Sequence, residues 1–332
     1  MTTLGSSYLK IADIVRRSKP DGSLAIITES QNQINGLAER MPWREGDLPA
    51  GTYATDRVAL PSFDTINPNG TVALGKSVTS QVLEPIEHIG KMSEVEDLVA
   101  TYGASPVAAK RADEAMTFYE GGKQTVSDRL LNGNGTTTAG QINGILTRYA
   151  SSTATNGRNV ILGGALGGQT DCMTIVMMKM GENNAYCFYP QGSKAGLQSQ
   201  DYGRGISEPS STTRKIVWRE YFRWSFGLAV PDWTSIACIR NIDKSLSVTG
   251  AGTDLYEKMT IGWHCLSRNG SGVPLILMNT TTRAILDIQA RNAVGAGGQL
   301  SYKEVDGKVI EHFRDMPIML EDKLSEAETA IS

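Results

Sequence analysis

The sequence predicts an α+β protein, in which helices and antiparallel strands occupy separate stretches of the chain. One long helical pattern lies between residues 106 and 132, and one long strand pattern lies between residues 216 and 230. Turn signals at residues 67–70 and 305–308 predict two hairpins. The 332 residues include 35 glycines, a composition typical of many turns and extended connections.

Charge and hydropathy exclude several classes of protein. The chain carries 32 Lys and Arg against 35 Asp and Glu, a net charge of −3, so it lacks the positive field of a dedicated nucleic-acid binder. Residues 1–17 contain no apolar signal-peptide core, and residues 173–180 are too short to span a membrane. The cysteines form no C-x-x-C pair, so we expect reduced thiols in a reducing compartment: Cys172, Cys187, Cys238 and Cys265.

The first 40 residues contain a short amphipathic stretch that ends at Pro20-Asp21-Gly22. Its apolar positions are Leu9, Ile11, Ile14 and Val15. Its basic positions are Lys10, Arg16, Arg17 and Lys19.

Residues 41–82 predict an extended hairpin, because four prolines exclude a long helix. Strands are expected at residues 52–60 and 71–82, joined by the turn Asn67-Pro68-Asn69-Gly70. Period-two alternation puts one set of side chains on a single face of the second strand: Val72, Leu74, Lys76 and Val78. Such a ribbon is marginal alone in water and must pack on its own subunit or on another. The narrow apolar face favours another subunit.

Two helices are expected next. Ser93–Glu96 fits a capping box for a first helix through Tyr102, and Ser105-Pro106 fits the start of a longer one. Gly121-Gly122 could end or kink this helix, and Asn132-Gly133 is a typical stop. The helix carries one apolar stripe, and the opposite side is charged, with Lys110, Arg111, Asp113 and Glu114. The stripe consists of Ala108, Ala112, Ala115, Met116 and Tyr119.

The remaining chain mixes strands and helices. Buried strands are expected at residues 173–178, 185–189 and 273–278. We also expect a helix capped by Asp254, a second helix at residues 281–292, and a hairpin that joins residues 300–305 to 308–313. On the long strand 216–230 one parity is polar, with Arg219, Tyr221, Arg223 and Ser225. The other parity is apolar and predicts the core face: Ile216, Trp218, Phe222, Trp224, Phe226, Leu228 and Val230. Aromatics and bases also interleave in single-strand nucleic-acid binders, but the opposite parities favour a core strand.

Gly70–Ser77 matches the phosphate-binding pattern G-x-x-x-x-G-K-S. That loop should follow a buried strand and open a helix. Pro68-Asn69 precedes the motif here, and the strand alternation runs through it, so a strand is favoured. A nucleotide-binding enzyme that uses Gly70–Ser77 remains the alternative function. The three histidines, His88, His264 and His312, have no metal-ligand spacing, and we expect no catalytic, cofactor-binding or metal site.

Two stretches carry a resemblance to a known family. Leu130-Leu131-Asn132-Gly133-Asn134-Gly135, followed by Gln141-Ile142-Asn143-Gly144-Ile145-Leu146, resembles major capsid proteins of tailed double-stranded DNA phages. Those proteins share the Hong Kong 97-type fold. Tyr189–Leu197, Trp218–Trp233 and Arg240–Asp243 resemble the capsid proteins of short-tailed phages (podoviruses), such as those of the Bordetella phage type. The resemblance covers most of residues 40–320.

The resemblance implies a domain order. It consists of an N-terminal arm (1–40), an extended E-loop hairpin (41–82), a P-domain with a long spine helix (83–150), an A-domain (151–270), and the remaining A- and P-domain strands with the C-terminus (271–332). It also implies a function: a late structural protein, not an enzyme, that self-assembles into an icosahedral capsid around double-stranded DNA. Assembly would take place in the host bacterial cytoplasm.

The resemblance implies partners as well. The chain would assemble with itself as hexamers and pentamers, and with a portal, a scaffold and a cement or decoration protein, without a membrane or a cofactor. It would contact the packaged double-stranded DNA only weakly and without sequence specificity, because the net charge is so small, with Arg16, Arg17 and Lys19 as the candidates. Residues expected at contacts between subunits lie in or beside the hairpin: Trp43, Arg44, Asp56, Arg57, Val72, Leu74 and Val78.

Overall fold

The computed structural model describes residues 33–331 except 69, 102–105, 166, 211–212, 246–251, 267–271, 293–299 and 306–307. The chain forms two compact units. Unit 1 contains Gln33, residues 88–126 and residues 194–225; unit 2 contains residues 34–87, 127–193 and 226–331. The amphipathic stretch around Leu9–Val15 and the basic residues Arg16, Arg17 and Lys19 lie outside the described residues, as does the expected helix cap Ser105.

Unit 1 is a strand ribbon packed with a long helix. Its strands are β4 (Glu87–Glu96), β8 (Gln198–Ser210) and the first part of β9 (Thr213–Ala229), and β9 pairs with both of the others. Its helices are α3 (Asp97–Thr101) and most of α4 (Val107–Asn132). The predicted long helix is confirmed, starts directly after Pro106 and ends at Asn132; Gly121-Gly122 does not interrupt it.

The predicted capping box at Ser93–Glu96 is wrong, because these residues belong to strand β4. Helix α3 begins only at Asp97. Pairing with β9 uses the backbone groups that a helix start would leave unpaired, so the sheet overrides the local cap. The Glu94 carboxylate instead accepts a hydrogen bond from Arg219 Nε, at 2.7 Å.

The apolar stripe of the long helix is mostly exposed. Met116 is 73% exposed, and Ala108, Ala112 and Tyr119 are exposed as well. Lys110, on the side expected to be polar, is only 7% exposed and donates from Nζ to the Ala100 carbonyl oxygen at 2.7 Å. Helical periodicity identifies an apolar face but does not say what covers it.

Strand β9 confirms the predicted long strand, and its apolar parity holds over only part of its length. Phe222, Phe226 and Leu228 are buried, and Arg223 is exposed. Toward the amino-terminal end Ile216 is half exposed and its neighbour Val217 is buried. A long ribbon twists, so one parity need not face the same surroundings along its whole length.

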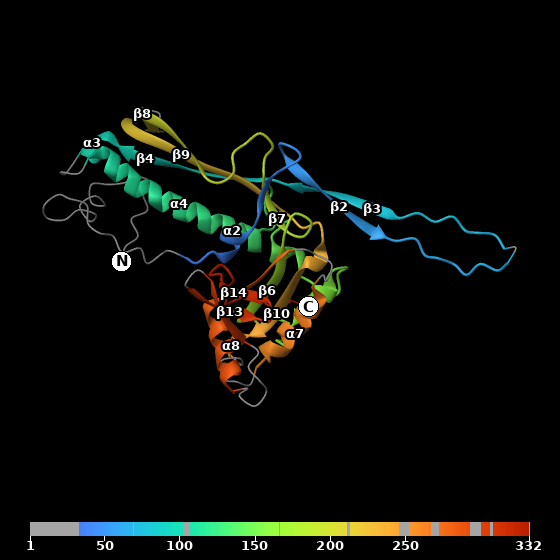
Figure 1. Cartoon of the computed structure of the whole chain (residues 1–332). Helices are drawn as coiled ribbons and strands as arrows, with labels where there is room; N and C mark the ends of the chain where they lie inside the picture. The colour runs from blue at the N-terminus through green and yellow to red at the C-terminus, as the bar shows by residue number, and fades with distance from the viewer. Residues whose placement is uncertain are drawn as a thin grey trace. The chain divides into compact units, whose positions relative to one another are not determined.

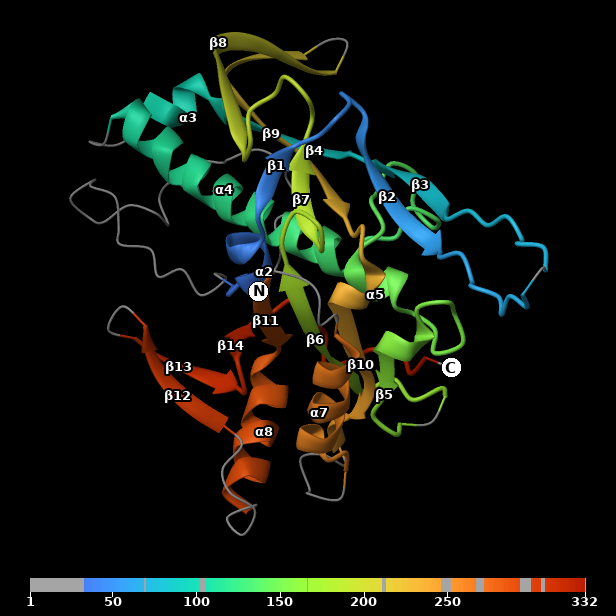
Figure 2. The same ribbon diagram turned by 45° about the vertical axis from the view of Figure 1, so that its right-hand side comes forward.

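The main core of unit 2 is a seven-stranded sheet with the order β12-β13-β14-β11-β6-β10-β5. Its strands are β5 (Val160–Leu162), β6 (Cys172–Met180), β10 (Ile236–Asp243), β11 (Val273–Met278), β12 (Leu300–Val305), β13 (Lys308–Phe313) and β14 (Met316–Leu320). Helices α7 (Leu255–Cys265) and α8 (Thr280–Asn292) lie beside each other against it (Figure 2). The predicted strands, hairpin and helices of this region are confirmed.

The central strands of this sheet are buried on both faces. Every residue of β10 is buried, and so is every residue of β6 but Lys179. Asp254 caps α7 by accepting from the Glu257 amide, as predicted, and Met259 of α7 lies in the same apolar cluster as the strands. Because β6 pairs directly with both β10 and β11, strands from before and after residue 270 share one core.

A smaller sheet in unit 2 joins β1 (Trp43–Glu45) to β7 (Tyr186–Tyr189), in parallel, and β7 to the last residues of β9. The described part of the unit also contains the short helices α2 (Gly36–Arg40) and α5 (Ile145–Arg148), and the 3₁₀ turns η1 (Gly157–Asn159) and η2 (Trp233–Ser235). The last pair of strands, β2 (Gly51–Ala59) and β3 (Val78–Pro85), forms a separate hairpin.

Candidate assembly surface

The β2–β3 hairpin projects from the rest of unit 2 (Figure 1). Its strands pair antiparallel from Gly51 opposite Pro85 to Ala59 opposite Val78. Its root is the end formed by residues 47–54 and 84–87, where the hairpin joins the rest of unit 2. Side chains are buried only at this root, and every residue from Thr55 to Gln81 that the structure describes is exposed. The hairpin therefore has no core of its own.

The exposed hairpin is rich in large apolar side chains. Phe63 is 97% exposed and Leu74 is fully exposed, at 104%. The other exposed apolar residues of the hairpin are Tyr53, Val58, Leu60, Ile66, Val72, Val78, Val82 and Leu83. Scattered apolar residues are normal on a protein surface, but such a concentration on one projecting element is typical of an interaction surface.

The segment between the two strands departs from the sequence prediction. Residues 71–77 do not form a strand, and β3 begins only at Val78. Pro61 and Pro68 lie in the facing segment, between β2 and the turn, and cannot donate the backbone hydrogen bonds that a longer ladder would need. The predicted turn is present, since the Gly70 amide donates to the Asn67 carbonyl oxygen at 2.8 Å.

The Gly70–Ser77 motif lacks the context of a phosphate-binding loop. Ser77 is followed directly by strand β3, where such a loop needs a helix N-terminus. Lys76 is exposed on an extended segment. The described part of this segment provides no cradle of converging amides, and no residue that the structure describes supports the nucleotide-binding alternative.

The contact residues predicted from the sequence fall in three places. Asp56 and Arg57 lie exposed on β2, opposite Ser80 and Thr79, and Val78 begins β3. Val72 and Leu74 lie in the segment between the strands.

Trp43 and Arg44 are not on the hairpin, because β1 pairs with β7. The Arg44 guanidinium lies over the Tyr186 ring, 4.5 Å from its centroid, and Arg44 also forms an ion pair with Asp47 at 3.5 Å. The range 41–82 expected for the hairpin thus includes a strand of another sheet.

Sequence reasoning did not single out Phe63, the most exposed aromatic residue of the hairpin. It lies in the irregular segment between Pro61 and the turn, where no hydrophobic period exists to mark it. An apolar residue within a proline-rich segment without periodicity was the only available signal.

The described residues contain no group of three or more His, Cys, Asp or Glu side chains that could hold a metal ion. His88 is hydrogen-bonded to Ser225 Oγ at 2.8 Å, and the His264 ring packs edge-on against Trp263. Complete burial raises the pKa of the Cys187 thiol and raises that of Cys238 to about 12, so both stay protonated and unreactive. Among the described helices none is long and apolar enough to cross a membrane.

Comparisons with known proteins agree with this picture. The family model "Major capsid protein GP7" matches residues 19–332. No curated protein matches the chain. Among solved structures, a chain of bacteriophage Epsilon15 is similar over 100% of this chain and 99% of its own, at 23% identity and a TM-score of 0.80.

More distant matches include an encapsulin complex from Synechococcus elongatus, at 12% identity and a TM-score of 0.45, over 71% of this chain and 97% of that one. The capsid of a native GTA particle is similar over 68% of this chain and 94% of that one, at 9% identity and a TM-score of 0.43. The Epsilon15 likeness confirms the expected Hong Kong 97-like fold. The family model covers nearly the whole sequence, and the chain therefore belongs to the Major capsid protein GP7 family, whose members are structural proteins of bacteriophage shells.

Proposed function

We propose that the β2–β3 hairpin, residues 51–85, is the main element through which one subunit packs on its neighbour in the shell. The exposed Phe63 and Leu74 carry this proposal. Burying a large apolar side chain stabilises a contact by roughly 1.5–3 kcal/mol relative to leaving it in water, so several together can hold two subunits. Asp56, Arg57, Val72 and Val78 would lie in the same contact.

The shell would be a closed icosahedral assembly of hexamers and pentamers of this chain, in a short-tailed phage. Repeated use of one heterologous contact closes into rings when the rotation permits it. In this assignment the hairpin is the E-loop, α4 is the spine helix of the P-domain, and the seven-stranded sheet forms most of the A-domain. The residues before Gln33 would be the N-terminal arm.

The shell would enclose double-stranded DNA without reading its sequence, because a net charge of −3 offers only local basic contacts. It would be assembled in the host bacterial cytoplasm, with a portal, a scaffold and a cement or decoration protein as further partners. We also propose that the protein has no catalytic activity, since members of its family are structural.

The test is the double variant Phe63→Ser/Leu74→Ser. Both side chains are exposed in the subunit, so its fold should be unchanged, while the contact with the neighbour loses its apolar centre. We expect soluble, folded subunits that no longer form particles by electron microscopy or sedimentation. The matched control is Ser62→Ala/Thr65→Ala in the same exposed segment, which should assemble normally.

Normal particles from Phe63→Ser/Leu74→Ser would place the main contact elsewhere. Insoluble protein from the same variant would contradict the exposure of these side chains in the subunit. Circular dichroism of the soluble fraction checks that the variant subunits are folded.

A further inference from the structure

Two glutamates lie where the hairpin joins the body of unit 2. Glu84 is near the end of β3, and Glu87 begins β4, with Pro85 and Ile86 between them. Although both are carboxylates, they are only 6% and 5% exposed. Charged groups are rarely buried unless they are paired, so this root contains an arrangement that requires explanation.

Glu84 is held by a two-pronged ion pair. Arg148, the last residue of α5, donates from both terminal nitrogens to the two Glu84 carboxylate oxygens, at 2.7 Å each. The same guanidinium donates to the Asn143 carbonyl oxygen at 2.8 Å and to the Leu228 carbonyl oxygen at 3.3 Å. One side chain therefore ties β3 to α5 and to the end of β9.

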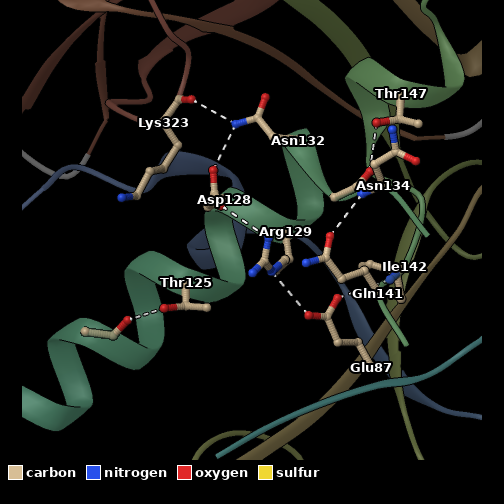
Figure 3. A network of polar contacts seen from close by, with 12 residues as sticks. Glu87, Thr125, Asp128, Arg129, Asn132, Asn134, Gln141, Ile142, Thr147 and Lys323 are labelled. Carbon is tan, nitrogen blue, oxygen red and sulfur yellow. Dashed lines mark hydrogen bonds and ion pairs between the residues drawn. The ribbon is translucent and has the colours of Figure 1, made fainter. Parts of the chain in front are cut away.

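Glu87 forms a second, separate connection (Figure 3). Its Oε1 lies 3.2 Å from Arg129 Nε, in the last turn of α4, and its Oε2 accepts from the Ile142 amide at 3.1 Å. In the loop that follows α4, the Gln141 side-chain oxygen accepts from the Asn134 amide at 3.3 Å. Glu87 thus joins the chain leaving the hairpin to the end of α4 and to the loop that follows it.

The start of β2 is also held at the root of the hairpin by hydrogen bonds. Asp47 accepts from Thr52 Oγ1 at 2.6 Å and from the Tyr53 amide at 3.2 Å, and the Ile86 amide donates to the Ala50 carbonyl oxygen at 3.3 Å. A Cβ on Gly51 would lie 2.4 Å from the Glu84 carbonyl oxygen, so the two strands approach closely there. Polar contacts hold both strands at the root, whereas the described residues from Thr55 to Gln81 are exposed.

Buried ion pairs are a poor source of stability, because the cost of desolvation offsets most of the attraction. What they can provide is geometric specificity, since a bidentate arginine–carboxylate pair tolerates little rotation. An arm whose direction is fixed in advance also loses less conformational entropy on binding.

We propose that Glu84 and Glu87, with Arg148 and Arg129, are positioning residues that fix the direction of the hairpin in the free subunit. This inference rests on the proposed role of the hairpin in assembly, which it extends from contact to orientation. The two ion pairs act as two separate attachment points on either side of Pro85-Ile86, so neither alone sets the direction.

The test measures hairpin direction in unassembled, full-length subunits. Spin labels at Thr65→Cys, on the exposed segment, and at Glu182→Cys, in the exposed turn after β6, report one distance by pulsed electron resonance. Cys265→Ser removes the half-buried native thiol, and the other three cysteines are buried. We expect one narrow distance distribution for the parent.

Two double variants remove both charges of a pair, so neither leaves an uncompensated buried charge. Glu84→Gln/Arg148→Met and Glu87→Gln/Arg129→Met should each fold and each broaden the distribution about twofold, as more orientations become populated. The matched control is Glu208→Gln/Arg214→Met, the same substitutions at an exposed ion pair of 2.9 Å, and it should leave the distribution unchanged.

Unchanged distributions in folded samples of both root variants would overturn the proposal. If one variant proves insoluble, the other gives the answer, and Arg148→Lys, which keeps the charge but loses the fork, should give an intermediate width. This result does not depend on particle formation. If the root variants give broad distance distributions but still assemble into normal particles, the link to assembly is contradicted, while the role of these residues in positioning the hairpin stays supported.

Discussion

The chain contains two antiparallel ribbons that differ in what covers them. In unit 1, β9 of the β8–β9 ribbon packs against α4, where the Phe222 ring stacks on Phe118 with 5.0 Å between centroids. Charged residues reinforce this ribbon, since Arg111 of α4 lies 2.7 Å from Asp201 of β8. In unit 2, the β2–β3 ribbon has apolar residues of similar size, and no helix of its unit covers them beyond the root.

The difference shows that a strand's residue types do not decide whether it is stable within its own subunit. Phe222 is 2% exposed and Phe63 is 97% exposed, although both are phenylalanines on extended segments. The first contributes to the free energy of unfolding of the subunit. The second can contribute only after another surface covers it.

The largest expected effect is that of Phe222→Ala. Removing a buried aromatic ring costs about 3–5 kcal/mol of unfolding free energy, because it loses the transfer energy and leaves a cavity. Chemical denaturation of the unassembled subunit measures this loss. The neighbouring, exposed Arg223→Ala is the control and should change the stability by less than about 0.5 kcal/mol. Trp224, predicted as a core residue, is half-buried, so Trp224→Ala should lie between the two.

A smaller effect should appear with pH, and it has opposite signs at two carboxyls, Glu321 of unit 2 and Asp201 of unit 1. In unit 2, the fully buried Glu321 accepts from the Leu37 amide at 3.0 Å, in the helix that precedes the hairpin. Burial raises the pKa of Glu321 to about 7, against 4.5 for the ordinary carboxyl. Its contribution to stability is therefore fully present below pH 4.5 and is lost as the pH rises through about 7.

The contribution of Glu321 to the unfolding free energy should thus fall between pH 4.5 and about pH 7, by at most about 3 kcal/mol, and Glu321→Gln should remove this part of the pH dependence. Denaturation across that pH range measures it. In unit 1, hydrogen bonds from Arg111 and from the Gly203 amide hold the pKa of Asp201 below 3.8, so its contribution is present above that pH and is lost in acid. The same pH dependence in the parent and in Glu321→Gln would contradict the assignment for Glu321.

The smallest expected effect is that of Lys76→Ala. Lys76 is exposed between the two strands of the uncovered ribbon, so neither unfolding free energy nor assembly should change measurably. The same variant tests the Gly70–Ser77 motif. Saturable ATP binding by the parent, lost in Lys76→Ala, would show that this segment adopts a phosphate-binding conformation after all.

Local patterns were sufficient where local hydrogen bonds determine the structure. Asp254 marked the start of α7 and Asn132-Gly133 the end of α4, because caps and stops depend on a few neighbouring residues. The Ser93–Glu96 capping box failed where β4 pairs with β9, a partner more than a hundred residues away in sequence. The strand predicted at residues 71–77 is absent for a related reason, since a strand needs a hydrogen-bonded partner and the prolines in the facing segment cannot supply one.

The sequence by itself determined the α+β class, the long helix, the long strand and an extended hairpin too narrow to bury its own apolar face, because each depends on periodicity and turn chemistry. Only the tertiary structure showed that the stripe containing Met116 is exposed and that Lys110 is buried. It also placed Glu84 and Glu87 against Arg148 and Arg129 at the root of the hairpin. Burial and ion pairing join residues distant in the chain, and the pattern of one segment contains no information about which partner it will meet.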